Sequence, residues 1–199
     1  IVVNSTIVLN SSDLTAGGIF NSAGSTTSLT NSIVASNSAA SSNNDVQGAF
    51  VSVRSNFIGD AGTSTGLVNG ANGNLVGTTQ SPIDPVFGPL ASNGGPTQTH
   101  KLLIGSPAID AGNNSGGEPL DQRGGRRPTD TTADIGAFEV QVNNLSINDV
   151  MMNEGSAGST FFVFTVLLEA VSADPVSISY GTIQDTAQQG GDFIATSGT

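Results

Sequence analysis

The sequence predicts an all-β protein that begins with a stack of short strands. Valine, isoleucine and threonine recur in short bursts between Gly, Ser and Asn residues, which is typical of strands separated by turns. No window of about twelve or more residues has sustained helical periodicity. A short motif of Asn, Ser, an apolar pair and Asn also recurs at an offset of 27 residues. Together these observations favour a repetitive β structure at the N-terminal end.

The repeat predicts a β-solenoid over residues 1–78. Residues 4–10 (NSTIVLN) align with residues 31–37 (NSIVASN), and residues 55–59 (SNFIG) are a weaker third copy. Residues 17–21 (GGIFN) form a further short strand bounded by glycines. Short strands at such a period are typical of stacked coils, whose strands lie about 4.8 Å apart. We expect apolar side chains inside the stack and hydrogen-bonded asparagines at its turns.

The N-terminal end of this stack is expected to need a cover. The chain opens directly in the strand-like sequence IVVNSTIVLN, with no signal peptide before it. An uncovered end coil would expose apolar side chains and unpaired strand edges. The sequence therefore predicts that more coils precede Ile1 or that another subunit covers that end.

Composition and charge narrow the possible functions. The net charge of −11, with only five basic residues, argues against a basic surface that binds nucleic acid or an anionic membrane. It suits attraction of divalent cations, and solubility alone would explain it equally well. The absence of cysteine fits an extracellular bacterial protein without disulfides. No apolar stretch reaches the roughly 18–20 residues of a membrane span. An ice-binding threonine ladder is excluded, because Thr30 aligns with Val3 at the repeat offset.

Residues 93–139 differ from their neighbours and are dense in Gly, Pro and Asp. They contain the single histidine and four of the five basic residues. The ordered motifs in and just before this run are DP (84–85), GPL (88–90), NGGPTQTH (93–100), GSPAIDAG (105–112), DQRG (121–124) and DIGAFE (134–139). Over residues 43–139 this series resembles the choice-of-anchor Q domain. The resemblance implies a right-handed parallel β-helix with a C-terminal cap over residues 79–139, in a large bacterial protein displayed at the cell surface. It implies no catalytic reaction.

After a linker at residues 140–144, the sequence changes character again. The motifs are LSINDV (145–150), NEG (153–155), FVFTV (162–166), PVSISY (175–180) and GGDF (190–193). They resemble the first part of a Calx-β domain, an Ig-like sandwich, over residues 145–199. The resemblance implies that the later strands and their acidic cluster are missing. Because a sandwich needs about seven strands, we expect this partial sandwich to be disordered, truncated, or completed by a strand from another chain.

The Calx-β resemblance implies a calcium site. Glu154 and Asp192 match positions that supply carboxylates to calcium in that family, and Asp185 lies close enough in sequence to join them. Calcium takes about six to eight oxygen ligands, so these three residues form an incomplete set. The alternative is that Glu154 and Asp192 cap turns.

The charged residues of the 79–139 region allow two interpretations. Paired acids with an arginine base occur in β-helix polysaccharide lyases and glycosidases. The preferred interpretation is structural, with Arg–carboxylate pairs that hold an irregular Gly- and Pro-rich backbone. Asp110 is expected in an Asx turn, and His100, without a second His or Cys, in a single hydrogen bond. The residues concerned are Asp110, Asp121, Arg123, Arg126, Arg127, Asp134 and Glu139.

These observations together predict a non-enzymatic structural or adhesive protein outside a bacterial cell. Its partner would be a second copy of itself, in a fibre or matrix joined through the open ends, or a surface polysaccharide. One alternative is the C-terminal segment of a carbohydrate-active β-helix enzyme, a lyase or hydrolase, with its catalytic coils before Ile1. The other is a calcium-responsive binding module.

Overall fold

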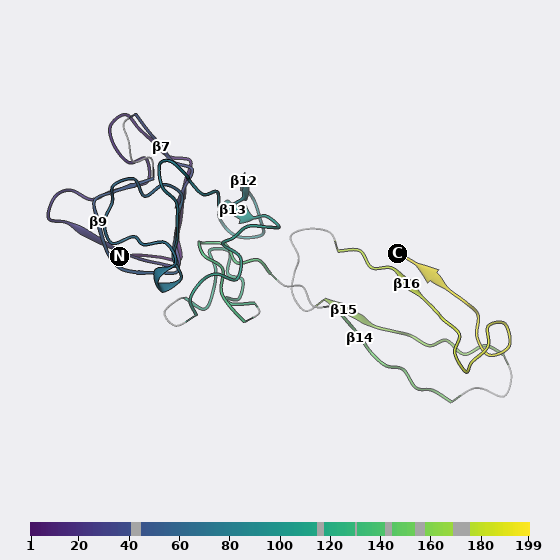
Figure 1. The fold of residues 1–199 in the computed structure, drawn as a ribbon. Coiled ribbons are helices and arrows are strands. Elements are labelled where there is room, and N and C mark those ends of the chain that lie inside the picture. The colour runs from purple at the N-terminus through teal and green to yellow at the C-terminus, as the bar shows by residue number, and fades with distance from the viewer. Residues whose placement is uncertain (41–44, 115–117, 130, 142–144, 154–157, 169–175) are drawn as a thin grey trace. The chain divides into compact units, whose positions relative to one another are not determined.

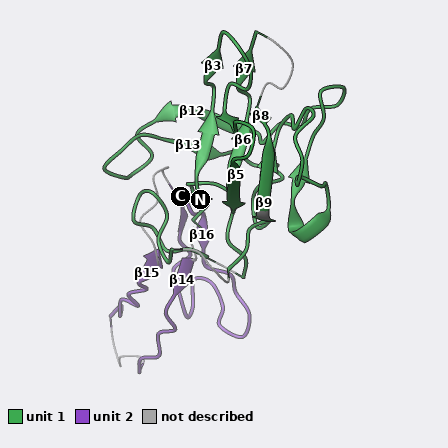
Figure 2. Ribbon diagram, turned by 90° about the vertical axis from the view of Figure 1, so that its left-hand side faces the viewer, with its two compact units in different colours: residues 1–142 green, residues 143–199 purple. Residues whose placement is uncertain are grey.

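The computed structural model describes residues 1–40, 45–114, 118–129, 131–141, 145–153, 158–168 and 176–199. The chain divides into two compact units, residues 1–142 and 143–199, drawn in different colours in Figure 2. The described residues form an all-β structure with parallel sheets (Figure 1), so the prediction of an all-β chain is confirmed. The single helical element among them is a short 3-10 helix, η1 (Ala71–Gly73). No helix in the described part of the chain is long and apolar enough to cross a membrane.

Parallel pairing joins successive copies of the repeat. The largest sheet consists, in spatial order, of β11 (Leu75–Val76), β10 (Phe57–Ile58), β6 (Ile33–Ala35) and β2 (Thr6–Val8). A second parallel sheet consists of β1 (Val2–Val3), β5 (Thr26–Thr30) and β9 (Ala49–Arg54). Two further parallel pairs are β3 (Ser11–Ser12) with β7 (Ser38–Ala39) and β4 (Ile19–Phe20) with β8 (Val46–Gln47).

The strand register confirms the offset read from the sequence. Thr6 lies opposite Ile33, and Ser11 lies opposite Ser38. Val3 lies opposite Thr30, so no threonine row runs through this position. Side-chain hydrogen bonds between equivalent positions span 27, then 24, then 18 residues. The repeat therefore shortens along the chain, which explains why its third copy is weak in the sequence and its fourth, at β11, is not recognisable.

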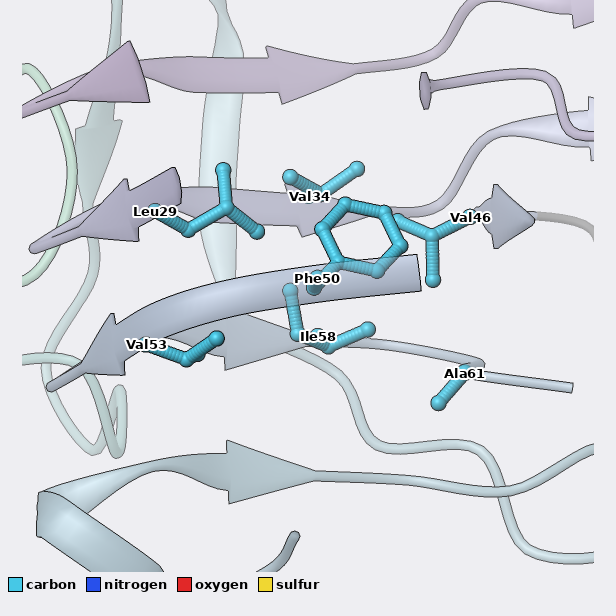
Figure 3. Close-up of a cluster of buried hydrophobic side chains, with 7 residues drawn as sticks. All are labelled: Leu29, Val34, Val46, Phe50, Val53, Ile58 and Ala61. Atoms are coloured by element: carbon cyan, nitrogen blue, oxygen red, sulfur yellow. The ribbon is translucent and has the colours of Figure 1, made fainter. Parts of the chain in front are cut away.

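One apolar cluster fills the space between these sheets. Figure 3 shows seven buried side chains from successive repeats that gather there: Leu29, Val34, Val46, Phe50, Val53, Ile58 and Ala61. Burying one large aliphatic or aromatic side chain contributes roughly 1.5–3 kcal/mol. Alternating residues of β6 and β10 point into this cluster, as the two-residue period of a strand requires.

Polar side chains line up at both ends of the four-stranded sheet. At its start, the backbone N–H of Ser32 donates to Asn56 Oδ1 (3.0 Å), and the N–H of Asn56 donates to Asn74 Oδ1 (3.0 Å). At its end, Asn10 Nδ2 donates to Asn37 Oδ1 (2.9 Å), and Asn37 Nδ2 donates to Asp45 Oδ1 (2.9 Å). These amides satisfy backbone groups that the turns leave unpaired. The expectation of hydrogen-bonded asparagines at the turns is confirmed.

The outer face of the four-stranded sheet is covered by the described residues of the range 83–140, here called the covering segment. A second apolar cluster joins Ile33, Ala35 and Phe57 of the sheet to Leu102, Ala108 and Ile135 of this segment. The segment contains one antiparallel pair, β12 (Phe87–Ala91) with β13 (Thr99–Leu102). Because the sheet is buried on both faces, β6 and β10 read as continuous apolar runs rather than alternating ones.

Residues 143–199 form two antiparallel pairs: β14 (Leu145–Ile147) with β15 (Val166–Leu168), and β16 (Tyr180–Gly181) with β17 (Ser197–Gly198). The side chains of Phe161, Phe162, Val163 and Phe164 are 84%, 46%, 73% and 52% exposed. Their exposure alternates with period two, with Phe162 and Phe164 on the less exposed face. The less exposed face is still open, because no second layer packs on it among the described residues of this unit.

Candidate functional site

The charged residues singled out in the sequence gather inside the covering segment. Asp121, Arg127, Asp134 and Glu139 are each less than 10% exposed, and the Arg123 side chain is nearly as well buried. Turns and irregular backbone position all five. The region therefore concentrates charge in a place where an unpaired ion would be strongly destabilising.

Asp121 and Arg123 form the first pair of this cluster. Arg123 Nη2 lies 2.7 Å from Asp121 Oδ2, and Arg123 Nε donates to the same oxygen at 2.8 Å. The guanidinium also donates to the carbonyls of Asn93 (3.1 Å) and Glu139 (2.5 Å). Its carbon lies 3.7 Å from the centre of the Phe138 ring, in cation–π contact. Arg123 thus ties three separate parts of the segment together.

Arg127 bonds mainly to backbone. Its Nη1 donates to the carbonyl of Gly136 (2.7 Å), and its Nη2 donates to the carbonyl of Asp134. Its Nε lies 3.7 Å from Glu139 Oε2, close enough for an ion pair but too far for a hydrogen bond. Burial lowers the pKa of Arg127, and the nearby carboxylates oppose that shift.

Asp134 and Glu139 accept hydrogen bonds from the backbone around them. Asp134 accepts the N–H groups of Asp110 (2.9 Å) and Val140 (2.5 Å). Glu139 accepts those of Thr129 (3.3 Å) and Asp134 (2.8 Å). Burial is the main cause that raises the pKa of Asp134 to about 6 and that of Glu139 to about 7, while these hydrogen bonds act in the opposite direction.

The oxygens of this cluster are all engaged by the protein itself. Asp121 Oδ1 accepts the N–H groups of Arg123 and Gly125, and its Oδ2 accepts that of Glu139. With the bonds above, every carboxylate oxygen of Asp121, Asp134 and Glu139 has an N–H donor. A general acid or base must reach a proton of the substrate directly or through one water. Raised pKa values often mark active sites. In Asp134 and Glu139, whose pKa values are raised, both carboxylate oxygens instead accept backbone N–H groups of the protein.

Three of the residues named from the sequence lie outside this network of buried side chains. Arg126 is exposed, unlike the buried Arg127, and its expected part in an Arg–carboxylate pair stays a prediction. Asp110 is also exposed and has a left-handed backbone (φ 54°). Its backbone N–H donates to Asp134 Oδ1. His100 pairs through Nδ1 with the carbonyl of Gly88 (2.8 Å) and packs edge-on against Phe87.

A cavity with both polar and apolar walls adjoins the cluster where the covering segment meets the first repeat. Its volume is about 420 Å³, within the roughly 300–1,000 Å³ of small-ligand sites. The first repeat contributes Val3, Asn4, Ser5 and Thr6, and the covering segment contributes Glu118, Leu120, Asp121, Gln122, Arg127 and Ala137. Sequence reasoning missed this cavity, because its two sides lie more than a hundred residues apart. The signal that could have drawn attention to it is the repeat itself, which places Asn4 at the position of Asn31.

The three residues proposed for calcium do not form a visible ligand set. Glu154 lies outside the described residues. Asp192 Oδ2 accepts the N–H of Gln188 (2.7 Å), and the N–H of Asp192 donates to the Gln188 carbonyl (2.9 Å), which is the geometry of a capped turn. Asp185 is exposed. Within the described ranges, no three His, Cys, Asp or Glu side chains are grouped so that they could hold a metal ion.

Comparison of this chain with models of protein families, with curated proteins and with solved structures gave no match.

Proposed function

We propose that the chain is a structural, non-enzymatic part of an extracellular protein, in which residues 1–78 form the coils of a right-handed parallel β-helix. The location at a bacterial cell surface rests on the resemblance to the choice-of-anchor Q domain. The β-helix is supported by four parallel ladders that repeat at one offset over the first two copies. In this proposal the covering segment locks the outer face of the stack, and the whole unit acts as a rigid support.

The observation that carries this proposal is the state of the buried carboxylates. Each oxygen of Asp121, Asp134 and Glu139 already accepts a backbone or arginine N–H. Such groups hold irregular backbone in place. For catalysis they would have to leave these donors unpaired, at a cost of about 1–3 kcal/mol for each buried group.

The test is a pair of isosteric substitutions, Asp134→Asn and Asp121→Asn, studied in the full chain. We expect no turnover of a panel of acidic and neutral polysaccharides by the unsubstituted protein, and a lower midpoint of urea denaturation in both variants. Asp185→Asn, at an exposed position, is the matched control and should leave the midpoint unchanged. Polysaccharide cleavage that disappears in Asp134→Asn while the midpoint stays the same would overturn the structural assignment.

The second part of the proposal is that residues 143–199 mediate assembly with a second copy of the chain. Several large apolar side chains of this unit are more than 70% exposed: Met151, Phe161, Val163, Ile183 and Ile194. Exposed apolar patches of this kind mark contact surfaces. Both antiparallel pairs also have edges that are unpaired within the described residues, and such edges can accept a strand from another chain. A second copy supplies the same surface and the same edges by symmetry.

Sedimentation velocity over a hundredfold range of concentration tests this assembly. We expect dimers or larger species that dissociate in the double variant Phe161→Ser, Val163→Ser, and that persist in the control Gln188→Ser, whose side chain is exposed and polar. A monomer at every concentration would refute assembly with a second copy. So would the finding that further strands of a longer polypeptide pair with these edges in the same molecule.

A further inference from the structure

The side-chain amide of Asn31 binds the backbone of Asn113, a residue of the covering segment. Asn31 Nδ2 donates to the carbonyl of Asn113 (2.7 Å), and Asn31 Oδ1 accepts the N–H of the same residue (2.7 Å). One side-chain amide thus pairs with both polar backbone groups of one residue, as a neighbouring strand would. Asn31 is fully buried in this arrangement, with only 1% of the residue exposed.

Asn4 occupies the same position one repeat earlier. Its backbone is left-handed like that of Asn31, with φ of 46° against 48°. Its N–H donates to the carbonyl of Thr30 (3.0 Å), as the N–H of Asn31 donates to that of Arg54 (3.1 Å). The two asparagines are therefore equivalent in backbone geometry and in their place in the stack.

The side chain of Asn4, unlike that of Asn31, has no protein partner. Both its Oδ1 and its Nδ2 are buried and make no hydrogen bond with any described residue. A buried amide without partners costs about 1–3 kcal/mol for each group. Asn4 also lines the cavity of about 420 Å³ between the first repeat and the covering segment. A donor, an acceptor and an adjoining space of ligand size thus occur together.

We propose that Asn4 and this cavity bind a short extended segment of another polypeptide by its backbone. The central residue of that segment donates its N–H to Asn4 Oδ1 and accepts from Asn4 Nδ2 through its carbonyl, as Asn113 does with Asn31. The contact between Asn31 and Asn113 sets the ligand chemistry: one residue whose N–H and C=O groups both face the same side-chain amide. The cavity walls include Glu118 and Gln122, whose side chains can bond to polar side chains of such a segment.

The covering segment holds the cavity in shape from the other side. The N–H of Ala137 donates to Thr6 Oγ1 (2.9 Å), and the N–H of Gly136 donates to the carbonyl of Asn31 (2.8 Å). Arg127, which also lines the cavity, is fixed by its bonds to the carbonyls of Gly136 and Asp134. A site that is rigid before binding loses less entropy when a ligand binds. The proposal does not depend on whether the chain is enzymatic.

The experiment is an NMR titration of the full chain, labelled with nitrogen-15, with the acetylated and amidated peptide Asp-Ala-Gly-Asn-Asn. This peptide reproduces residues 110–114, the sequence that fills the Asn31 site. We expect a saturable shift of the Asn4 side-chain amide signals. The Asn31 side-chain signals should not move, because the Asn31 amide is already bonded to Asn113. These signals therefore serve as the internal control.

Two changes separate backbone recognition from nonspecific contact. A peptide methylated on the nitrogen of its first Asn lacks the donor for Oδ1, and we expect it to bind about tenfold more weakly or worse. Asn4→Asp keeps the shape of the side chain but removes its donor, and Asn4→Gly suits the positive φ. Neither variant has the Asn4 side-chain amide signal, so binding is followed through the backbone N–H signals of Thr6 and Gln122, which line the cavity. Both variants should lose the saturable shift of these signals. No shift in the unsubstituted protein would mean that water alone satisfies Asn4, and it would overturn the proposal. Equal binding of the methylated peptide would overturn it as well, even if the variants failed to fold.

Discussion

Replacing Asn56 by Ala tests whether the side-chain ladder stabilises the stack. Asn56 is completely buried and occupies the centre of the ladder. Its Oδ1 accepts the N–H of Ser32 (3.0 Å), and its Nδ2 donates to the carbonyls of Leu29 (3.1 Å) and Arg54 (3.0 Å). Alanine would remove these three bonds and a fourth, from Asn56 Nδ2 to Asn74 Oδ1 (3.1 Å), and would leave buried backbone groups without partners.

The size of the effect follows from these contacts. Each buried group left unpaired costs about 1–3 kcal/mol, and the groups share one site, so their costs do not add fully. We expect Asn56→Ala to lower the free energy of unfolding by about 3–5 kcal/mol. For a chain of this size, that corresponds to a fall in Tm of roughly 10 °C.

The assay is urea denaturation followed by circular dichroism, with Ser5→Ala as the control. Ser5 has the equivalent position at the end of the ladder, is only partly buried, and donates a single side-chain bond to the carbonyl of Val3. Its replacement should cost about 1 kcal/mol. The reasoning is refuted if Asn56→Ala costs no more than Ser5→Ala.

Three further predictions concern other parts of the chain. Because burial raises the folded-state pKa of Glu139 from 4.5 to about 7, the folded state holds this proton more tightly. The free energy of unfolding should therefore fall as pH rises through this interval, by about 3 kcal/mol at most. Glu139→Gln should flatten that slope in denaturation curves at pH 5 and pH 8. Gly136→Ala should destabilise by about 2–4 kcal/mol, because φ is +109° and a Cβ would lie 2.8 Å from Ile33 Cδ1. In Gly124→Ala, where φ is +86° and the surrounding space is open, the loss should be about 1 kcal/mol, and equal losses would contradict the packing argument. If calcium binds residues 143–199, chelator should lower Tm in the unsubstituted chain and have no effect on Asp192→Asn; an unchanged Tm in both would exclude that site.

The sequence was sufficient to predict the stack and its register. The motif shared by residues 4–10 and 31–37 places Thr6 opposite Ile33, as the structure does. It was also sufficient to predict asparagine bonds at the turns, since few other side chains satisfy turn backbone groups. The shorter spacings of 24 and 18 residues hide the later strands. Turns of different length change the spacing between copies without disturbing the hydrogen-bond ladder. A search for one fixed period therefore does not find the later strands.

The charged cluster was only partly predictable. The sequence places arginines and acids together in a Gly- and Pro-rich run, which predicted Arg–carboxylate ion pairs. Asp121 and Arg123 form one such ion pair. That Asp134 and Glu139 bind backbone N–H groups depends on loop conformations that no local pattern specifies. The contact between Asn31 and Asn113 spans 82 residues. A contact at such separation leaves no periodic trace in the sequence, and the cavity beside Asn4 was missed for the same reason.

Site-resolved hydrogen exchange tests the central claim most directly, namely that the covering segment and the stack form one rigid support. The N–H of Phe57 donates to Ser32 within the stack (2.9 Å), and the N–H of Gly136 donates from the covering segment to Asn31 (2.8 Å). If the two parts unfold together, both amides exchange through the same global event, with similar free energies of opening. The account predicts this result. Exchange of Gly136 a hundredfold or more faster than that of Phe57, or about 3 kcal/mol less protected, would mean that the segment opens separately and would contradict it.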